Sequence, residues 1–387
     1  MKKVVIRAPL LTKSGYGVHS RQLFQYLVGK PNIELKTQIV PWGITPWYTN
    51  FDSCNGLIGE AIKRSNTTPE EKFDVSFQVQ LPNEWDAGVA SYNVGVTAGV
   101  ETDKCNPTWG SVHCNKMDKI IVPSAHTEKS FKNSAVIQTP MHVVPEAYFE
   151  NLINTPEHLD LDISTNFNFL TVGVLTGFTP DTDRKNLFYL IKWFVEEFRN
   201  DPDVGLIVKT NSGRDTAIDK SATRQMLNKI LKEVGHEGTP KVHLLHGSMT
   251  RDEMNALYKN SKVKALISAT RGEGFGLPLL EASVAGLPVL ATNWSAHTEF
   301  LNMGRWVKFD YDLMPISEQR CDNNIFMPGA NWAYAREESF KKSLRKFYKN
   351  SEIPTRWAAD LSEKLKDTHS ISSIIKCYDK VLKEVLG

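Results

Sequence analysis

The stretch Ser268-Ala-Thr-Arg-Gly-Glu-Gly-Phe-Gly-Leu-Pro-Leu-Leu-Glu-Ala-Ser-Val-Ala-Gly-Leu-Pro-Val-Leu290 joins a strand, a glycine-rich turn and the start of a helix. Residues 264–268 predict a buried strand, and the glycines at 272, 274 and 276 predict a turn. Pro278 stands where a helix can begin without losing a needed N–H. Backbone N–H groups and the positive end of that helix would face the same ligand, so the stretch predicts an anion site at a strand end of an α/β sheet.

Strand and helix patterns alternate along the whole chain. The first half predicts strands at 3–7, 34–40, 74–79, 92–97 and 119–122, with helices at 18–28 and 127–133. The second half predicts strands at 168–175, 204–209, 241–244, 263–268 and 288–291, with helices at 187–199 and 221–234. This alternation predicts an α/β protein made of two Rossmann-like, doubly wound domains that face a central cleft.

The 387 residues are too many for one ordinary core and suit two domains. The polar segment 151–166 predicts a linker. We therefore expect an N-terminal domain over residues 1–160 and a C-terminal domain over 161–365. The tail from residue 332 has a mostly helical pattern, and residues 366–387 are expected to form a helix that packs back on the N-terminal domain.

The composition, 41% hydrophobic and 23% charged, is that of a soluble globular protein. The net charge of +2 is too small to indicate a polyanionic partner. Five scattered cysteines without a C-x-x-C pair suit free thiols in a reducing compartment. The chain starts on the strand-like run Val4-Val5-Ile6 without a signal-peptide pattern, and no window reaches the ~18 apolar residues of a membrane span. These features predict a cytoplasmic protein.

Two acids stand close to the predicted anion site. Glu273 lies in the glycine-rich turn, and Glu281 lies about one turn into the helix. The neighbours of Glu281 at helical spacing are all apolar, namely Leu277, Pro278, Val284 and Ala285. A carboxylate on an apolar face needs a partner. The hydroxyl groups of a ligand would serve, and a glutamate that caps a backbone turn is the structural alternative.

This segment resembles the E-x7-E signature of GT-B glycosyltransferases, in particular the large family 4 of retaining enzymes. Glu273 and Glu281 are the paired acids, and Gly-Phe-Gly-Leu-Pro, Ala-Gly-Leu-Pro-Val and residues 298–300 also fit. The resemblance implies that Glu273 lies against the donor sugar as a catalytic residue and that Glu281 holds the ribose hydroxyls. It also implies that backbone amides face the sugar and diphosphate, those of Gly274, Phe275, Gly276 and Leu277.

A second matching segment follows the strand at 168–175. Arg184 and Lys185 stand at a loop-to-helix junction, and two cations there suit a diphosphate leaving group. The run Arg-Lys-Asn resembles the phosphate-binding motif of the family. The sequence departs from the pattern at Val174, where many members carry arginine, and in the longer loop 176–183. A solvated charge pair that opens a helix is the structural alternative.

The N-terminal loop carries Gly15-x-Gly17, one glycine short of a dinucleotide fingerprint, and no acid ends the second strand. These residues argue against a nicotinamide enzyme. The GT-B resemblance instead implies that Gly15 and Gly17 let the loop approach the donor diphosphate, and a plain turn is the alternative. Residues 95–103 resemble N-domain segments of some family 4 members. That resemblance implies that Glu101 contacts acceptor or donor in a catalytic role, while a surface carboxylate is the alternative.

The run 341–349 is basic, with Lys341, Lys342, Arg345 and Lys346. Acids at 337 and 338 precede the two lysines by four residues, the spacing of ion pairs on one helix. A solvated helix face is the first interpretation. Peripheral contact with an anionic membrane, or contact with nucleic acid, is the second.

The resemblance implies a retaining enzyme that moves a hexosyl or pentosyl group from a nucleoside diphosphate sugar to an acceptor hydroxyl. No cofactor besides the donor is expected, and no metal site, because no Asp-x-Asp at a strand end appears in a metal-ligand context. The acceptor stays open among glycan, lipid, small molecule, protein and a 5-hydroxymethylated DNA base. The alternatives are a sugar-nucleotide epimerase or phosphorylase on the same scaffold, and a non-catalytic nucleotide-sugar-binding protein.

Overall fold

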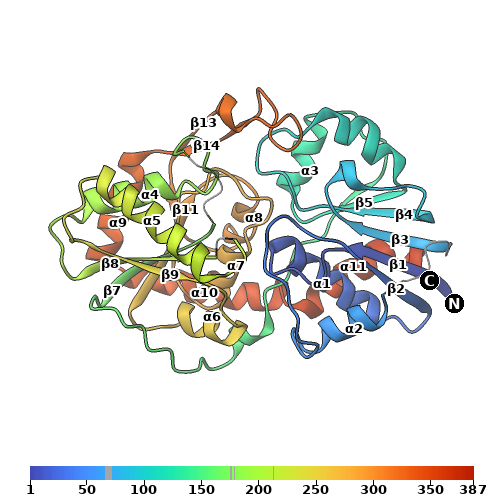
Figure 1. Cartoon of the computed structure of the whole chain (residues 1–387), viewed down its shortest axis with the longest axis horizontal. Helices are drawn as coiled ribbons and strands as arrows, with labels where there is room; N and C mark the ends of the chain where they lie inside the picture. The colour runs from blue at the N-terminus through green and yellow to red at the C-terminus, as the bar shows by residue number, and fades with distance from the viewer. Residues whose placement is uncertain (66–71, 175–176, 178, 212) are drawn as a thin grey trace. The chain divides into compact units, whose positions relative to one another are not determined.

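The computed structural model describes residues 1–65, 72–174, 177, 179–211 and 213–387. The chain divides into two compact units (Figure 1), unit 1 with residues 1–147 and 371–387, and unit 2 with residues 148–370. The division therefore falls at Ala147, where the sequence placed it at residue 160. Within the described part of the chain, no helix has the length and apolar character to cross a membrane.

Unit 1 is a parallel six-stranded sheet in the order β2-β1-β3-β4-β5-β6. Its strands are β1 (Lys2–Ala8), β2 (Ile33–Ile39), β3 (Phe73–Val79), β4 (Ala90–Val96), β5 (Lys119–Val122) and β6 (Met141–Val143). Its helices are α1 (Gly15–Val28), α2 (Leu57–Lys63), α3 (Ala125–Lys132) and α11 (Ile371–Leu386), with short turns η1 (Pro82–Glu84), η2 (Trp109–His113) and η3 (Cys114–Lys116).

The last helix of the chain belongs to unit 1. Apolar residues of α11 join those of α1 and β1 in one core. The rings of Tyr378 and Tyr26 stack at 5.3 Å, and Lys2 Nζ donates to the carbonyl of Val385 at 2.7 Å. This segment begins at Ile371, five residues after the start expected from the sequence. Unit 1 is therefore assembled from two distant parts of the chain.

Unit 2 contains a second parallel sheet, in the order β12-β11-β10-β7-β8-β9. Its strands are β7 (Phe167–Val172), β8 (Val204–Thr210), β9 (Lys241–His246), β10 (Val263–Ser268), β11 (Val289–Thr292) and β12 (Val307–Phe309). Its helices are α4 (Leu187–Glu197), α5 (Ala217–Glu233), α6 (Arg251–Tyr258), α7 (Leu277–Val284), α8 (His297–Leu301), α9 (Glu337–Lys349) and α10 (Glu352–Thr368). Two short turns, η4 (Glu150–Ile153) and η5 (Glu318–Arg320), and an antiparallel hairpin, β13 (Tyr311–Pro315) with β14 (Asn331–Ala335), complete the unit.

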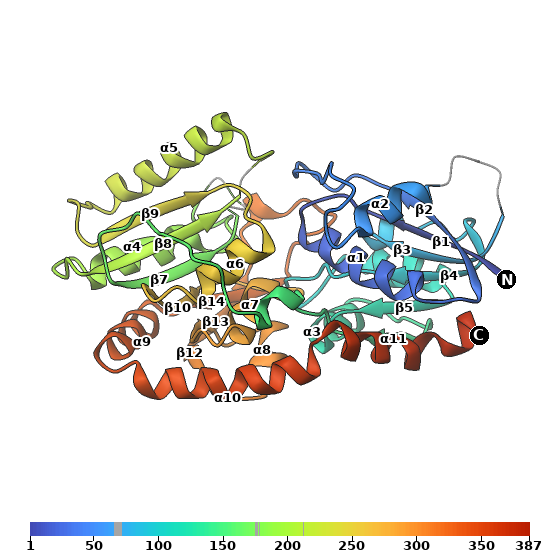
Figure 2. The ribbon, with the colours of Figure 1, turned by 90° about the horizontal axis from the view of Figure 1, so that it is seen from below.

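Both faces of the unit 2 sheet are covered, as Figure 2 shows with α5 on one side and α10 on the other. Neighbouring residues of one strand enter different cores: Phe169 packs with residues of α4, α5 and α9, while Leu170 packs with residues of α7 and α10. Since side chains alternate along a strand, a strand with two buried faces is apolar throughout. This explains the continuous apolar runs that predicted these strands.

The strand order also fixes where a ligand can bind. The chain adds β8 and β9 on one side of β7, and then returns to add β10, β11 and β12 on the other side. The loops that follow β7 and β10 therefore diverge at the carboxyl edge of the sheet. Open α/β sheets bind ligands at this switch point.

Three expectations differ from the structure. Residues 332–335 lie in strand β14 and not in a helical tail, because β14 pairs with β13 and Trp332 packs in a small core with Ile316 and Phe326. The predicted strand at 168–175 ends at Val172, and Leu175 lies outside the described residues. The predicted linker at 151–166 packs within unit 2, where Leu152 is fully buried.

The basic run on α9 has a structural role for two of its cations. Lys341 Nζ lies 2.6 Å from Glu196 of α4, and Arg345 Nε lies 2.6 Å from Glu197 of the same helix. These pairs join α9 to α4. Lys342 and Lys346 are exposed, as a solvated helix face requires.

Candidate active site

The candidate site lies at the switch point of unit 2, where two loops leave neighbouring strands. Strand β10 leads into the glycine-rich turn and then into α7, and β7 leads towards Asp183-Arg184-Lys185 and then into α4. Because β7 and β10 are parallel neighbours, their carboxyl ends meet at one edge. The structure thus brings together the two segments that the sequence singled out separately.

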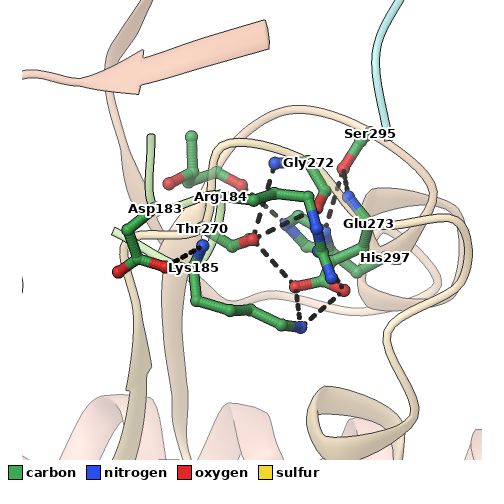
Figure 3. Close-up of polar contacts among 9 residues, drawn as sticks. Asp183, Arg184, Lys185, Thr270, Gly272, Glu273, Ser295 and His297 are labelled. Carbon is green, nitrogen blue, oxygen red and sulfur yellow. Dashed lines mark hydrogen bonds and ion pairs between the residues drawn. The ribbon is translucent and has the colours of Figure 1, made fainter. Parts of the chain in front are cut away.

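Glu273 lies at the centre of this site, enclosed by cations and a hydroxyl group (Figure 3). Lys185 Nζ lies 2.6 Å from Oε1 and 2.9 Å from Oε2 of Glu273, and Arg184 NH1 lies 3.3 Å from Oε2. Thr270 Oγ1 donates to Oε1 at 2.8 Å. Both carboxylate oxygens therefore accept charge-assisted or hydroxyl hydrogen bonds, which fix the orientation of the side chain.

These contacts decide the charge of Glu273. Burial raises the pKa of the carboxyl, but the nearby charges of Lys185 and Arg184 and the hydrogen bond from Lys185 outweigh it, so that the pKa falls to about 2. The carboxylate is therefore ionised throughout the neutral range. It can accept hydrogen bonds there, but it cannot donate a proton as a general acid.

The low pKa of Glu273 predicts a specific loss of stability in acid. The folded pKa of about 2 lies below the ordinary value of 4.5, so the ionised group stabilises the fold above pH 4.5, and this contribution is lost as the pH falls towards 2. Urea unfolding at pH 5, 4 and 3 should show that the free energy of unfolding falls more steeply for the native protein than for Glu273→Gln, which cannot titrate at this position. Parallel declines would contradict the proposed contacts.

The backbone of the turn is anchored by residues after β11. The N–H of Glu273 donates to Ser295 Oγ at 2.9 Å, and this oxygen lies 3.3 Å from His297 Nδ1. His297 Nε2 lies 2.7 Å from the carbonyl of Thr292, so this nitrogen carries the proton. Burial lowers the pKa of His297, which keeps the imidazole neutral. The sequence reasoning missed Ser295 and His297, although their position directly after a predicted strand was a usable signal.

The start of α4 fixes the positions of Arg184 and Lys185, the two cations of the loop that follows β7. Asp183 is buried, and its Oδ2 accepts from the N–H of Leu187, the first residue of the helix, at 2.8 Å. Arg184 NH1 also donates to the carbonyl of Gly272 at 2.7 Å. Arg184 and Lys185 are thus held towards the glycine-rich turn, and the solvated charge pair that was the structural alternative is not what the structure shows.

Glu281 lies apart from this cluster, on helix α7. Its Oε2 accepts from the hydroxyl of Tyr258 at 3.1 Å, and the side chain is half-buried. Burial raises the pKa of Tyr258 and the charge of Glu281 raises it further, so the phenol stays protonated as a donor. Tyr258 is thus one of the hydrogen-bond partners that a carboxylate on an apolar helix face needs.

The predicted donor-binding backbone, residues 274–277, runs through the turn before α7 to the first residue of that helix. Gly276 has φ +101°, and a Cβ there would come within 3.0 Å of His297 Cβ, so glycine fits best. The helix begins at Leu277 without a side-chain cap. The side chain of Phe275 packs against Phe300 in the core, so only its backbone could contact a ligand.

Unit 1 brings together its own predicted residues. Gly15 begins helix α1, and a Cβ there would meet nothing within 4 Å. A Cβ on Gly17 would lie 2.1 Å from the carbonyl oxygen of Thr12, so position 17 admits only glycine. Tyr16 Oη lies 2.9 Å from Thr97 Oγ1, just beyond β4. Burial raises the pKa of Tyr16, and the charge of Glu101 contributes to the rise. The glycine loop and Glu101 therefore lie at the same edge of the unit 1 sheet.

No group of three or more histidine, cysteine, aspartate or glutamate side chains that could hold a metal ion occurs within the described ranges. The charged groups of the unit 2 site instead suit an anion. Lys185, Arg184 and the start of α7 outweigh the single carboxylate of Glu273, and such a site can stabilise growing negative charge.

Residues 180–312, which contain both loops of this site, match the family "Glycosyl transferases group 1". This segment is a glycosyltransferase domain. The protein is accordingly an enzyme of the glycosyltransferase class. No curated protein matches the sequence.

Solved structures similar to this glycosyltransferase establish its fold as GT-B. HepE of Anabaena, in complex with UDP and glucose, has a TM-score of 0.64 at 14% identity, over 100% of both chains. Sucrose-phosphate synthase of Thermosynechococcus elongatus has a TM-score of 0.66 at 12% identity, over 100% of this chain and 99% of that one. The pneumococcal O-GlcNAc transferase GtfA, in complex with UDP and GlcNAc, has a TM-score of 0.52 at 15% identity, and the match covers 81% of this chain but 57% of that one.

Proposed function

We propose that this glycosyltransferase is a retaining enzyme of the E-x7-E type, which moves a sugar from a nucleoside diphosphate sugar to an acceptor hydroxyl without an essential metal ion. One observation carries the proposal. An ionised, buried Glu273 is held by Lys185 and Arg184 at the switch point of the domain that matches the family.

The contacts of Glu273 favour a binding role over a nucleophilic one. A carboxylate nucleophile needs an oxygen that can approach the anomeric carbon, whereas Oε1 and Oε2 both accept hydrogen bonds from Lys185, and Oε1 accepts a further one from Thr270. In the proposed reaction the bond between the anomeric carbon and the phosphate oxygen breaks first. The acceptor oxygen then bonds to the same face of the sugar, and its proton passes to the departing phosphate.

The departing diphosphate requires positive charge. Negative charge grows on its oxygen as the sugar leaves, and preorganised cations stabilise that charge without rearranging. Lys185, Arg184 and the backbone amides of residues 274–277 are the groups that would do so. Glu273 keeps the two cations in place and contacts the sugar hydroxyls, and Glu281 with Tyr258 binds the ribose hydroxyls of the donor.

For unit 1 we propose ligand contacts of its own. The Gly15–Gly17 turn would let backbone approach the diphosphate, and Glu101 would bind the acceptor or the sugar. Tyr16 supports this arrangement because its hydroxyl bonds to Thr97, four residues before Glu101.

Donor binding provides the direct test. Two of the similar structures hold UDP, so UDP-glucose and UDP-GlcNAc come first, followed by GDP- and ADP-sugars. At a hundred times its dissociation constant, a donor stabilises the protein by about 2.7 kcal/mol, which corresponds to a rise in Tm of about 5–10 °C. Free glucose serves as the control and should give no shift. The proposal fails if no nucleotide sugar raises the Tm.

Products then separate the reaction types. Transfer to an added acceptor supports the proposal, whereas phosphate-dependent sugar release indicates a phosphorylase and isomerised donor indicates an epimerase. Binding without turnover on any acceptor indicates a nucleotide-sugar-binding protein. For a hydroxymethylated DNA acceptor, binding to duplex DNA should weaken as salt rises.

A further inference from the structure

Arg271 lies two residues before Glu273, and its side chain connects the two loops of the site. It is fully buried. Its NH1 donates to the carbonyl of Asp181 at 2.7 Å, and its NH2 lies 3.4 Å from Oδ1 of Asn186. The backbone N–H of Arg271 also donates to the carbonyl of Arg184 at 2.9 Å. One residue of the β10 loop therefore contacts the β7 loop before, at and after the cations that hold Glu273.

The same side chain rests on the hairpin that the sequence did not predict. The guanidinium carbon lies 4.5 Å from the ring centroid of Tyr334 and 5.2 Å from that of Trp332. The N–H of Ala333, between these aromatics on β14, donates to the carbonyl of Arg271 at 2.8 Å. Strand β14 is thus joined to the glycine-rich turn by both backbone and side chain.

An arginine in this place is costly unless it performs a task that an apolar residue cannot. Burial of a guanidinium removes its hydration, and packing alone would be served better by a hydrophobic side chain of similar size. Nε of Arg271 has no hydrogen-bond partner within the described residues, so the hydration is only partly replaced. What arginine alone provides is a flat, rigid fork that bonds two separate acceptors while it stacks on aromatic faces.

We propose that Arg271 is a positioning residue of the transfer reaction. Held on Tyr334 and Trp332, its guanidinium fixes the loop 181–186 so that Arg184 and Lys185 face Glu273. The hairpin thereby acts on catalysis although none of its side chains belongs to the charged cluster. This inference rests on the proposed function.

Hydrogen exchange of the free enzyme tests the positioning directly and needs no substrate. In Arg271→Met and in Arg271→Lys, backbone amides of residues 182–187 should exchange at least about tenfold faster than in the native enzyme, because a lysine keeps the charge but not the fork. The matched control is Arg345→Met on α9. This change also removes a guanidinium that lies 4.5 Å from an aromatic ring, in this case the ring of Phe198. This control should leave residues 182–187 protected. Unchanged exchange in both Arg271 variants would overturn the inference.

Kinetics with the sugar donor that gives the largest thermal shift form the second arm. Hydrolysis or transfer should be about 100-fold slower in Arg271→Met, with the donor dissociation constant changed less than about threefold, since misplacement of reacting groups by about 1 Å costs turnover on this scale. Tyr334→Leu should slow turnover as well. The double variant Arg271→Met/Tyr334→Leu should be no slower than Arg271→Met, because both changes remove the same contact between the guanidinium and the ring.

The outcomes are distinguishable. A native enzyme that turns over no nucleotide sugar overturns the proposed function. A native enzyme that is active while Arg271→Met keeps its turnover and its protected loop overturns only the inference. A loss of donor affinity equal to the loss of turnover would assign Arg271 to binding and would also overturn it.

Discussion

Replacement of Glu273 by glutamine should lower kcat by about 100- to 1,000-fold while the donor still binds. Glutamine keeps the size of the side chain but removes the charge that Lys185 and Arg184 share, so both cations lose their orientation towards the departing diphosphate. Loss of one preorganised electrostatic contact in an active site has an effect of this size. Steady-state kinetics and calorimetric titration of the donor measure the two quantities separately.

The chain offers a matched control for Glu273→Gln. Glu196 of α4 is also a carboxylate between two cations, with Lys192 Nζ at 3.0 Å and Lys341 Nζ at 2.6 Å. Glu196→Gln removes the same charge from the same unit and should leave kcat unchanged. Glu281→Gln should instead raise the donor dissociation constant by about tenfold with little change in kcat, because a charged hydrogen bond to the bound donor is lost. Equal and negligible effects at Glu273 and Glu281 would remove the proposed division of roles.

Replacement of Lys185 by methionine should also lower kcat by about 100-fold or more, because the ammonium group nearest to Glu273 disappears. The same change should weaken the binding of UDP, or of the nucleoside diphosphate that the donor panel selects, while the binding of the corresponding nucleoside stays constant. Isothermal titration with both ligands gives the ratio of the affinity for the nucleoside diphosphate to the affinity for the nucleoside. This ratio isolates the contact with the diphosphate from any general damage to the site.

Lys192→Met is the control for the second variant. Lys192 lies on α4, the helix that follows Lys185, and its ion pair is with Glu196, outside the site. Turnover and the ratio of the two affinities should match those of the native enzyme. If Lys185→Met weakens the nucleoside as much as the diphosphate, the assignment of Lys185 to the leaving group is wrong.

Local chemistry made the glycine-rich turn predictable. The strand, the glycines and Pro278 follow one another along the chain, so the turn and the helix start could be predicted without knowledge of distant residues. The two Rossmann-like sheets were likewise predictable from apolar runs that repeat with helical patterns between them. The GT-B similarity confirms this fold class.

The contacts that tie the site together were not predictable. Lys185 and Glu273 meet only because β7 and β10 are neighbours, and strand order depends on packing across the whole unit. The strand at Trp332 was mistaken for part of a helical tail because its pairing with β13 and its small aromatic core outweigh the local pattern. For the same reason the role of Arg271 is visible only when β14 is in place.

The two-part composition of unit 1 has a consequence for how the enzyme is made. Residues 148–370 leave the ribosome as one uninterrupted piece, so unit 2 can fold as soon as it has emerged. Unit 1, although its first part is made before unit 2, keeps an open apolar face on α1 and β1 until α11, which follows unit 2 along the chain, has been made. Unit 1 therefore stays an incomplete domain throughout the synthesis of unit 2 and is completed after it.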